Sequence, residues 1–255
     1  MSVPHPLPLA GPLAGPLAGP LAGQSALITG ASRGIGAASA RALAALGARV
    51  VLVARSAAAL EALAAECAHG AAVFTTDLAA SGAAAEIATE TVRVLGYAPD
   101  IIVHSAGSFP IAPLEAATDA ALDLALALNV AVPLRLTRAF LASMRERGSG
   151  HVVTIGSVAD RAVFPSNAIY AASKHAVRAV HETLRAETRG SGVRATLISP
   201  AATDTAIWDP YDPDGSPHLP SRHEMLRPED VAEAVAWAVT RPSHVDVEEL
   251  RLARS

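Results

Sequence analysis

The stretch T-G-A-S-R-G-I-G at residues 29–36 decides how this chain folds. It continues the β-branched run S-A-L-I-T at residues 25–29 and leads into an Ala-rich segment typical of a helix. Glycine allows a tight turn and a close approach by a phosphate, and the free N–H groups at a helix start attract anions. We therefore predict a turn that binds a dinucleotide pyrophosphate. Its predicted contact residues are Gly30, Ser32, Arg33, Gly34, Ile35 and Gly36.

Apolar runs and helical segments alternate from this turn to the C-terminus. Strands are predicted to begin at residues 25, 49, 71, 100, 151, 193 and 245. Helices are predicted near 35–46, 56–68, 82–95, 115–147 and 169–189, and another begins at R-P-E-D, residues 227–230. Strict alternation of strands and helices produces a parallel sheet covered on both faces. The sequence therefore predicts a single α/β, Rossmann-like doubly wound domain with a mostly parallel seven-stranded sheet, spanning residues 21–255.

Length and composition fit one globular domain. The chain has 255 residues, of which 51% are hydrophobic and 17% are charged. A net charge of -4 gives no whole-molecule basic field that would attract nucleic acid or an acidic membrane. The single cysteine, Cys67, excludes an internal disulfide and is typical of a reducing compartment. We therefore expect a cytoplasmic protein with neither a nucleic-acid nor a membrane partner.

Two segments depart from the alternating pattern. Residues 1–20 carry most of a fourfold P-L-A-G repeat, in which Pro or Gly interrupts every apolar pair, and we predict a disordered arm rather than a signal peptide or a membrane helix. Residues 205–227 are rich in Pro, Asp and Gly, and we expect them to form a substrate lid. A surface insertion without function is the alternative for this second segment.

The residues after the second and third predicted strands bear on the choice of cofactor. NAD-binding chains place an acid near the adenosine ribose, whereas this chain has Arg55 there and Arg33 in the glycine turn. Two guanidinium groups suit a 2′-phosphate, so the pattern favours NADP over NAD. A pair of solvated arginines is the alternative. Asp77, followed by Leu78, is expected to accept a hydrogen bond from the adenine amino group.

The motif Y-A-A-S-K contains the only lysine of the chain, Lys174, four residues after Tyr170. Residues at this spacing share one face of a helix. A phenol has a pKa near 10, about three units above neutral pH, and a nearby positive charge stabilises its phenolate. We therefore predict that Tyr170 transfers a proton and that Lys174 supplies the charge. Ser157, at the end of the predicted fifth strand, is expected to fix a substrate carbonyl beside Tyr170.

The order and spacing of the glycine turn, a helical Asn, a Ser and Y-x3-K resemble those of the classical short-chain dehydrogenase/reductase family, from about residue 21 to the end. The resemblance implies a catalytic tetrad of Asn129, Ser157, Tyr170 and Lys174. In this tetrad Tyr170 is the general acid in reduction, Ser157 orients the carbonyl, and Asn129 holds a water that links Lys174 to solvent. The alternative for Asn129 is a polar interruption ahead of Pro133.

The resemblance also implies cofactor contacts after the fourth and sixth strands, where this chain departs twice from the family pattern. It has His104-Ser105 in place of the common Asn-Asn, so that Ser105 is expected to contact the ribose through its backbone, and Pro200-Ala201 in place of Pro-Gly. The implied contacts outside the glycine turn are Arg55, Asp77, Leu78, Ser105, Ala106, Gly107, Tyr170, Lys174, Pro200, Thr203 and Thr205.

These features together predict an NADP(H)-dependent oxidoreductase that transfers hydride between the nicotinamide and a ketone or secondary alcohol, acting in the cell as a carbonyl reductase. A homodimer or homotetramer, formed through the two long helices, is expected by analogy. Two alternatives are a non-catalytic dinucleotide-binding regulatory protein and an epimerase or dehydratase of the family's extended branch. The nine histidines show no recognised ligand spacing, so no metal site is predicted.

Overall fold

A computed structural model describes residues 18–67 and 70–255 of the chain. The described chain begins with a turn in which the Leu21 amide donates a hydrogen bond of 3.0 Å to the Leu46 carbonyl, and the Leu21 side chain is buried. The predicted end of the repeat arm at residue 20 falls inside this turn. Residues 1–17, which make up most of that arm, lie outside the described residues.

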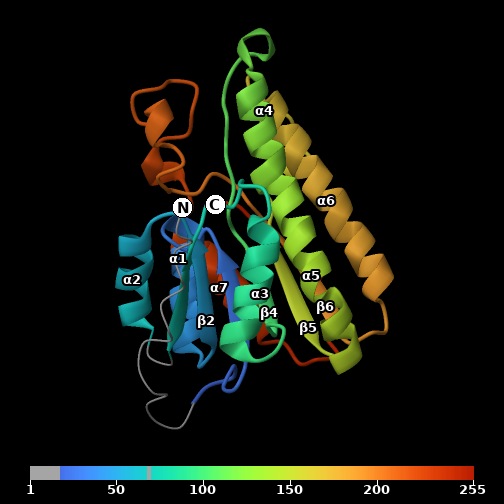
Figure 1. Cartoon of the computed structure of the whole chain (residues 1–255). Helices are drawn as coiled ribbons and strands as arrows, with labels where there is room; N and C mark the ends of the chain where they lie inside the picture. Colours follow the sequence, from blue (N-terminus) through green and yellow to red (C-terminus); the bar gives the residue numbers. More distant parts are fainter. Residues whose placement is uncertain (1–17, 68–69) are drawn as a thin grey trace.

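Seven parallel strands form one twisted sheet (Figure 1). The strands are β1 (Ser25–Thr29), β2 (Arg49–Ala54), β3 (Ala71–Thr75), β4 (Ile101–His104), β5 (Gly150–Ile155), β6 (Val193–Pro200) and β7 (Glu249–Leu252). Their spatial order is β3-β2-β1-β4-β5-β6-β7, and every neighbouring pair is parallel. The predicted doubly wound α/β fold is therefore confirmed, with β7 beginning four residues later than the sequence suggests.

Helices cover both faces of this sheet (Figure 1). They are α1 (Gly34–Ala45), α2 (Ala57–Glu66), α3 (Ala83–Leu95), α4 (Asp119–Leu126), α5 (Val132–Arg147), α6 (Ala168–Thr188) and α7 (Pro228–Val239). On one face α1 packs against α7, and on the other α3 packs against α5. The single helix predicted over 115–147 is in fact α4 and α5, joined by a π-helical turn at Ala127–Ala131.

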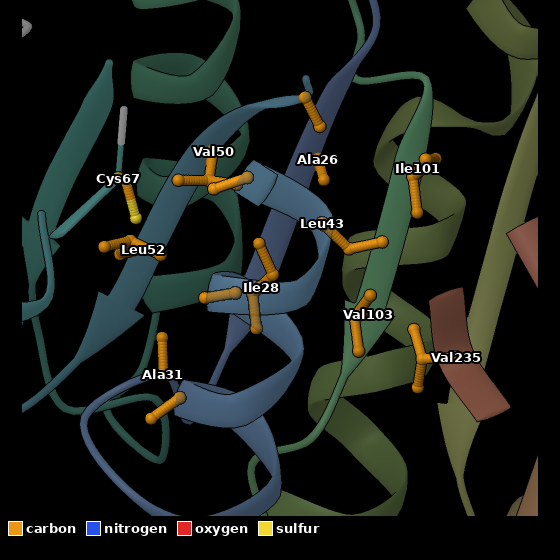
Figure 2. Close-up of a cluster of buried hydrophobic side chains, with 14 of the residues drawn as sticks. Ala26, Ile28, Ala31, Leu43, Val50, Leu52, Cys67, Ile101, Val103 and Val235 are labelled. Carbon is orange, nitrogen blue, oxygen red and sulfur yellow. The ribbon is translucent and has the colours of Figure 1, made fainter. Parts of the chain in front are cut away.

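Two apolar clusters, one on each face of the sheet, form the core. Figure 2 shows the cluster between α1, α7 and the sheet, in which Ile28, Leu52 and Val103 of adjacent strands meet Leu43 and Val235 of the two helices. Strands covered on both faces must be apolar along their whole length, which explains why the sequence shows continuous apolar runs and not alternation.

The strand order reverses at β1, whose neighbours are β2 on one side and β4 on the other. In open α/β sheets, ligands bind at such a reversal, beyond the carboxyl ends of the strands. The Thr29 hydroxyl, at the end of β1, accepts hydrogen bonds from the amides of Ser105 and Ala106 at 3.2 and 3.3 Å. These bonds connect the end of β1 to the loop after β4. The fold thus brings the glycine turn and the loop after β4 to one crevice.

Among the described residues, one helical stretch, Asp119–Arg147, is long and apolar enough to cross a membrane by length and composition. Phe140 and Met144 of this stretch are buried in the core of the domain, and Asn129 is buried beside α6. The stretch therefore serves as a structural helix of the domain.

Candidate active site

The glycine turn has the close backbone approach that a dinucleotide site requires. A side chain at Gly36 would place its Cβ 2.3 Å from the Gly30 carbonyl oxygen, so only glycine fits there. Arg33 precedes the first residue of α1, and its side chain makes no capping hydrogen bond. The first amides of α1 therefore remain available to an anion, and the residues present fit a pyrophosphate.

Two other predicted segments pack directly against this turn. Gly30 has a φ of +69°, and a Cβ on it would lie 2.8 Å from the Ala106 backbone. A Cβ on Gly34 would lie 2.9 Å from the Thr205 side chain. The structure therefore brings together three sets of predicted cofactor contacts: the turn, the loop after β4 and the segment after β6.

The residues predicted to contact the adenosine half follow β2 and β3. The Ala31 amide, inside the glycine turn, donates to the Val53 carbonyl at 3.2 Å, which joins the turn to the end of β2. Arg33 and Arg55 are both exposed. Asp77 is also exposed, and its Oδ1 accepts a hydrogen bond from the Ala79 amide at 3.0 Å, whereas Leu78 is buried.

Tyr170 and Lys174 lie together on α6, with the Lys174 Nζ 5.5 Å from the centre of the Tyr170 ring. The same Nζ donates a hydrogen bond of 2.9 Å to the Ile155 carbonyl at the end of β5. Ser157 follows two residues later, and its Oγ accepts a hydrogen bond from the Ala159 amide at 3.1 Å. The hydroxyl proton of Ser157 thus remains available to a substrate oxygen.

The environment of this pair changes the pKa of both groups. Burial raises the pKa of Tyr170 to about 12, although hydrogen bonding to Ser157 opposes this rise. Burial also lowers the pKa of Lys174 to about 8. At neutral pH Tyr170 therefore keeps its proton, which is the form that a general acid requires.

Asn129 lies in the π-helical turn between α4 and α5, a type of irregularity often found at functional sites. Its Oδ1 accepts from the Ser108 amide at 2.9 Å, and its Nδ2 donates to the Ser108 carbonyl at 3.0 Å and to the Ser173 hydroxyl at 2.8 Å. Because Pro133 has no N–H, it cannot donate to the Asn129 carbonyl four residues earlier. The loss of this donor fits the water that the resemblance implies at Asn129.

The structure accommodates both departures from the family pattern. His104 is buried, its Nε2 lies 2.9 Å from the Thr137 hydroxyl on α5, and burial lowers its pKa to about 3, so the ring is neutral. After Pro200, the Thr203 hydroxyl donates to the Ala201 carbonyl at 3.0 Å, and Thr203 forms a bridge with Leu226.

An aromatic cluster connects the predicted lid to Tyr170. The ring of Phe109 lies 4.6 Å from the ring of Tyr170, 4.8 Å from Trp208 and 5.9 Å from Tyr211, measured between ring centres. The Tyr211 hydroxyl donates to the Phe109 carbonyl at 2.7 Å and accepts from the Ile111 amide at 3.1 Å. The segment 205–227, in orange beyond the edge of the sheet in Figure 1, therefore contacts the candidate active site.

Sequence reasoning missed two residues of this site. Phe109 contacts Tyr170, and the only signal in the sequence was an aromatic residue two positions after Gly107. Ser173 binds Asn129 and donates to the Tyr170 carbonyl at 2.7 Å, and its signal was its place within Y-x3-K. The contacts of Phe109 with Tyr170 and of Ser173 with Asn129 join different elements, which local sequence patterns do not reveal.

Comparisons with known proteins agree with this geometry. The family model described as short chain dehydrogenase matches residues 24–215. An uncharacterized oxidoreductase of Staphylococcus aureus (strain MRSA252) is 34% identical over 226 residues, which are 88% of this chain and 94% of the relative. A solved metagenomic short-chain oxidoreductase in complex with NADP is 34% identical, with a TM-score of 0.79 over 92% of this chain and 99% of that one. A solved alcohol dehydrogenase of the archaeon Thermococcus sibiricus, complexed with 5-hydroxy-NADP, is 30% identical, with a TM-score of 0.80 over 90% and 95%.

Proposed function

Since this chain belongs to the short-chain dehydrogenase family and is an oxidoreductase, we propose that it is an NADP(H)-dependent carbonyl reductase that interconverts a ketone and a secondary alcohol. One observation carries this proposal. Ser157, Tyr170 and Lys174 come together at the carboxyl end of β5, beside the crevice where the strand order reverses. That position suits a reaction on a substrate held next to a dinucleotide.

The proposed cofactor site runs from Arg33 and Arg55, at the adenosine end, to Thr203 and Thr205. Two exposed guanidinium groups favour the 2′-phosphate of NADP, and two solved relatives hold NADP or its 5-hydroxy derivative. When bound, the reduced nicotinamide supplies a hydride, with its electron pair, to the carbonyl carbon.

The chain itself supplies the proton and stabilises the developing charge. The Ser157 hydroxyl donates a hydrogen bond to the substrate oxygen, and the Tyr170 phenol gives its proton to that oxygen, which becomes the alcohol hydroxyl. The phenolate that remains is stabilised by the Lys174 ammonium. The Asn129 carbonyl holds the water through which the proton is replaced from solvent.

We propose that the substrate carries an apolar substituent. Phe109, Trp208 and Tyr211 form an aromatic wall on the side of Tyr170 that faces the lid. The two arginines of the segment 205–227 already have acidic partners, since Arg222 is bound to Asp204 and Asp209 and Arg227 to Asp230. Such a wall favours alkyl or aryl ketones over substrates with a carboxylate.

The test of this function is a panel of ketones and alcohols, assayed with NADPH and NADP⁺ through nicotinamide absorbance. In the variant Tyr170→Phe, kcat should fall about 10³-fold because the proton donor is lost. NADPH affinity, measured by fluorescence titration, should stay within about twofold because the phenol hydroxyl is a minor part of a large ligand site.

The control for this variant is Tyr97→Phe, which changes a partly buried tyrosine packed against the core and should keep wild-type kcat. Undiminished turnover in Tyr170→Phe would refute the mechanism. Wild-type protein that binds NADPH and converts no member of the panel would favour the regulatory alternative.

A further inference from the structure

A buried carboxylate lies beside the candidate active site and has no part in the mechanism above. Asp160 ends the one-turn helix Val158–Asp160, three residues after Ser157, and only 1% of its surface is exposed. The hydroxyl of Ser199, on β6, donates a hydrogen bond to its Oδ2. Its Oδ1 has no hydrogen-bond partner within residues 18–67 and 70–255.

The Asp160 carboxylate and the Lys174 ammonium both lie close to the backbone of residues 155–156. A Cβ on Gly156 would be 3.0 Å from the Asp160 Oδ2. The adjoining residue, Ile155, offers the carbonyl to which the Lys174 Nζ donates. Both charged groups therefore lie near the end of β5 without forming a direct ion pair, and the Asp160 charge raises the pKa of both Lys174 and Tyr170.

A buried ammonium with one backbone hydrogen bond needs a counter-charge, because burial strongly disfavours an unpaired ion. Two arginines on the neighbouring parts of the chain have closer acidic partners than Asp160. Arg161, whose Nε lies 3.9 Å from the Asp160 Oδ1, is bound through its Nη2 to Glu249 of β7. On α6, one turn beyond Lys174, Arg178 pairs with Glu182 at 2.7 Å.

We propose that Asp160 is a positioning residue that supplies the counter-charge of the Lys174 ammonium and thereby sets the pH range in which Tyr170 and Lys174 work. This inference rests on the proposed function, because it concerns the same proton transfer. In this scheme Asp160 contacts neither substrate nor cofactor. It acts only through the electrostatic effect of its carboxylate on the Lys174 ammonium.

The sign of the effect follows from the charge. In alcohol oxidation the active form has Tyr170 ionised and Lys174 protonated, so the two pKa values of this pair set the two limbs of the profile of activity against pH. A negative charge raises the pKa of both groups. Removal of that charge therefore lowers both values, and the whole bell-shaped profile moves to lower pH.

The experiment compares Asp160→Asn with Ser199→Ala in pH profiles of kcat/KM for alcohol oxidation with NADP⁺. Asp160→Asn keeps the shape and a hydrogen-bond acceptor for Ser199, and both limbs of its profile should move down by about one pH unit. Ser199→Ala removes the hydrogen bond but keeps the carboxylate, so its limbs should stay at the wild-type position. Thermal unfolding by circular dichroism checks that each variant is folded.

Three other outcomes would overturn this proposal, and a fourth would refute the proposed function instead. A folded Asp160→Asn protein with unmoved limbs would overturn the proposal, as would an equal shift in Ser199→Ala. If Asp160→Asn does not fold, the smaller Asp160→Ser should show the same shift, and failure of both to fold would mark Asp160 as purely structural and overturn the proposal. Absence of wild-type turnover would instead refute the proposed function, which separates the two failures.

Discussion

At the scale of single residues, Arg55 is the side chain on which the choice of cofactor depends. It is exposed after β2, next to the glycine turn that is joined to that strand through the Ala31 amide. An exposed guanidinium costs little to hold in water and forms strong charge-assisted bonds once a phosphate arrives. An acid at the same position would instead repel the 2′-phosphate and accept from the free ribose hydroxyl of NAD.

The variant Arg55→Asp should therefore change cofactor preference. The ratio of kcat/KM with NADPH to that with NADH should fall about a hundredfold, because a charge-assisted bond is lost and a repulsion is gained. The matched control is Arg189→Asp, an exposed arginine just after α6, ahead of the amino end of β6. A ratio equal to wild type in Arg55→Asp would show that Arg55 is merely a solvated arginine.

At the scale of elements, the predicted lid, residues 205–227, is docked by contacts that join distant parts of the chain. Tyr211, in the one-turn helix Asp209–Tyr211, binds backbone groups of Phe109 and Ile111, about one hundred residues earlier. Arg222 ties the two ends of the same segment by binding Asp204 and Asp209. Because these contacts are few and the segment contains little regular structure, its opening should cost less free energy than unfolding of the sheet.

Tyr211→Phe should weaken this docking and raise KM for the carbonyl substrate roughly tenfold, since two hydrogen bonds of about 1 kcal/mol each are lost. The kcat should change less, because Tyr170, Lys174 and Ser157 are held by α6 and β5 rather than by the lid. Steady-state kinetics at saturating NADPH measures both constants. A KM equal to wild type would show that the lid does not enclose the substrate.

At the scale of the whole molecule, the stretch Asp119–Arg147 leaves several apolar side chains partly exposed. Leu122, Leu124 and Leu126 of α4 and Leu134 of α5 are each between 37% and 43% exposed. Side chains of this kind gathered along one helical stretch favour contact with another protein surface. We propose that a second copy of the chain covers them, as the analogy with the family suggests.

The double variant Leu124→Glu/Leu134→Glu should therefore lower the mass of the particle, as measured by analytical ultracentrifugation, because charges would be buried at the interface. Val92→Glu is the matched control, since Val92 is 42% exposed but lies on α3 and not on this stretch. Wild-type protein that sediments as a monomer would contradict the proposed assembly.

The sequence predicted every strand and most helices because their signals are local. Continuous apolar runs marked the buried strands, and glycine marked the ends of helices, as at Gly148, where φ is +68°. The exception is the π-helical turn at Ala127–Ala131, which looked like the middle of one long helix. Pro133 does signal that the Asn129 carbonyl lacks a donor four residues later, but nothing local signals that the backbone widens into a π-helical turn there.

By itself, the sequence determined which residues can carry the chemistry: a glycine turn after an apolar strand, and a tyrosine and a lysine one helical turn apart. Both patterns lie within a few residues, so backbone geometry alone places their side chains together. The contacts of Phe109 with Tyr170 and with Tyr211, and the hydrogen bond from Ser199 to Asp160, could be found only in the folded structure. These contacts join elements far apart in the chain, and the burial that shifts the pKa of Tyr170 and Lys174 exists only once the sheet and its helices have packed.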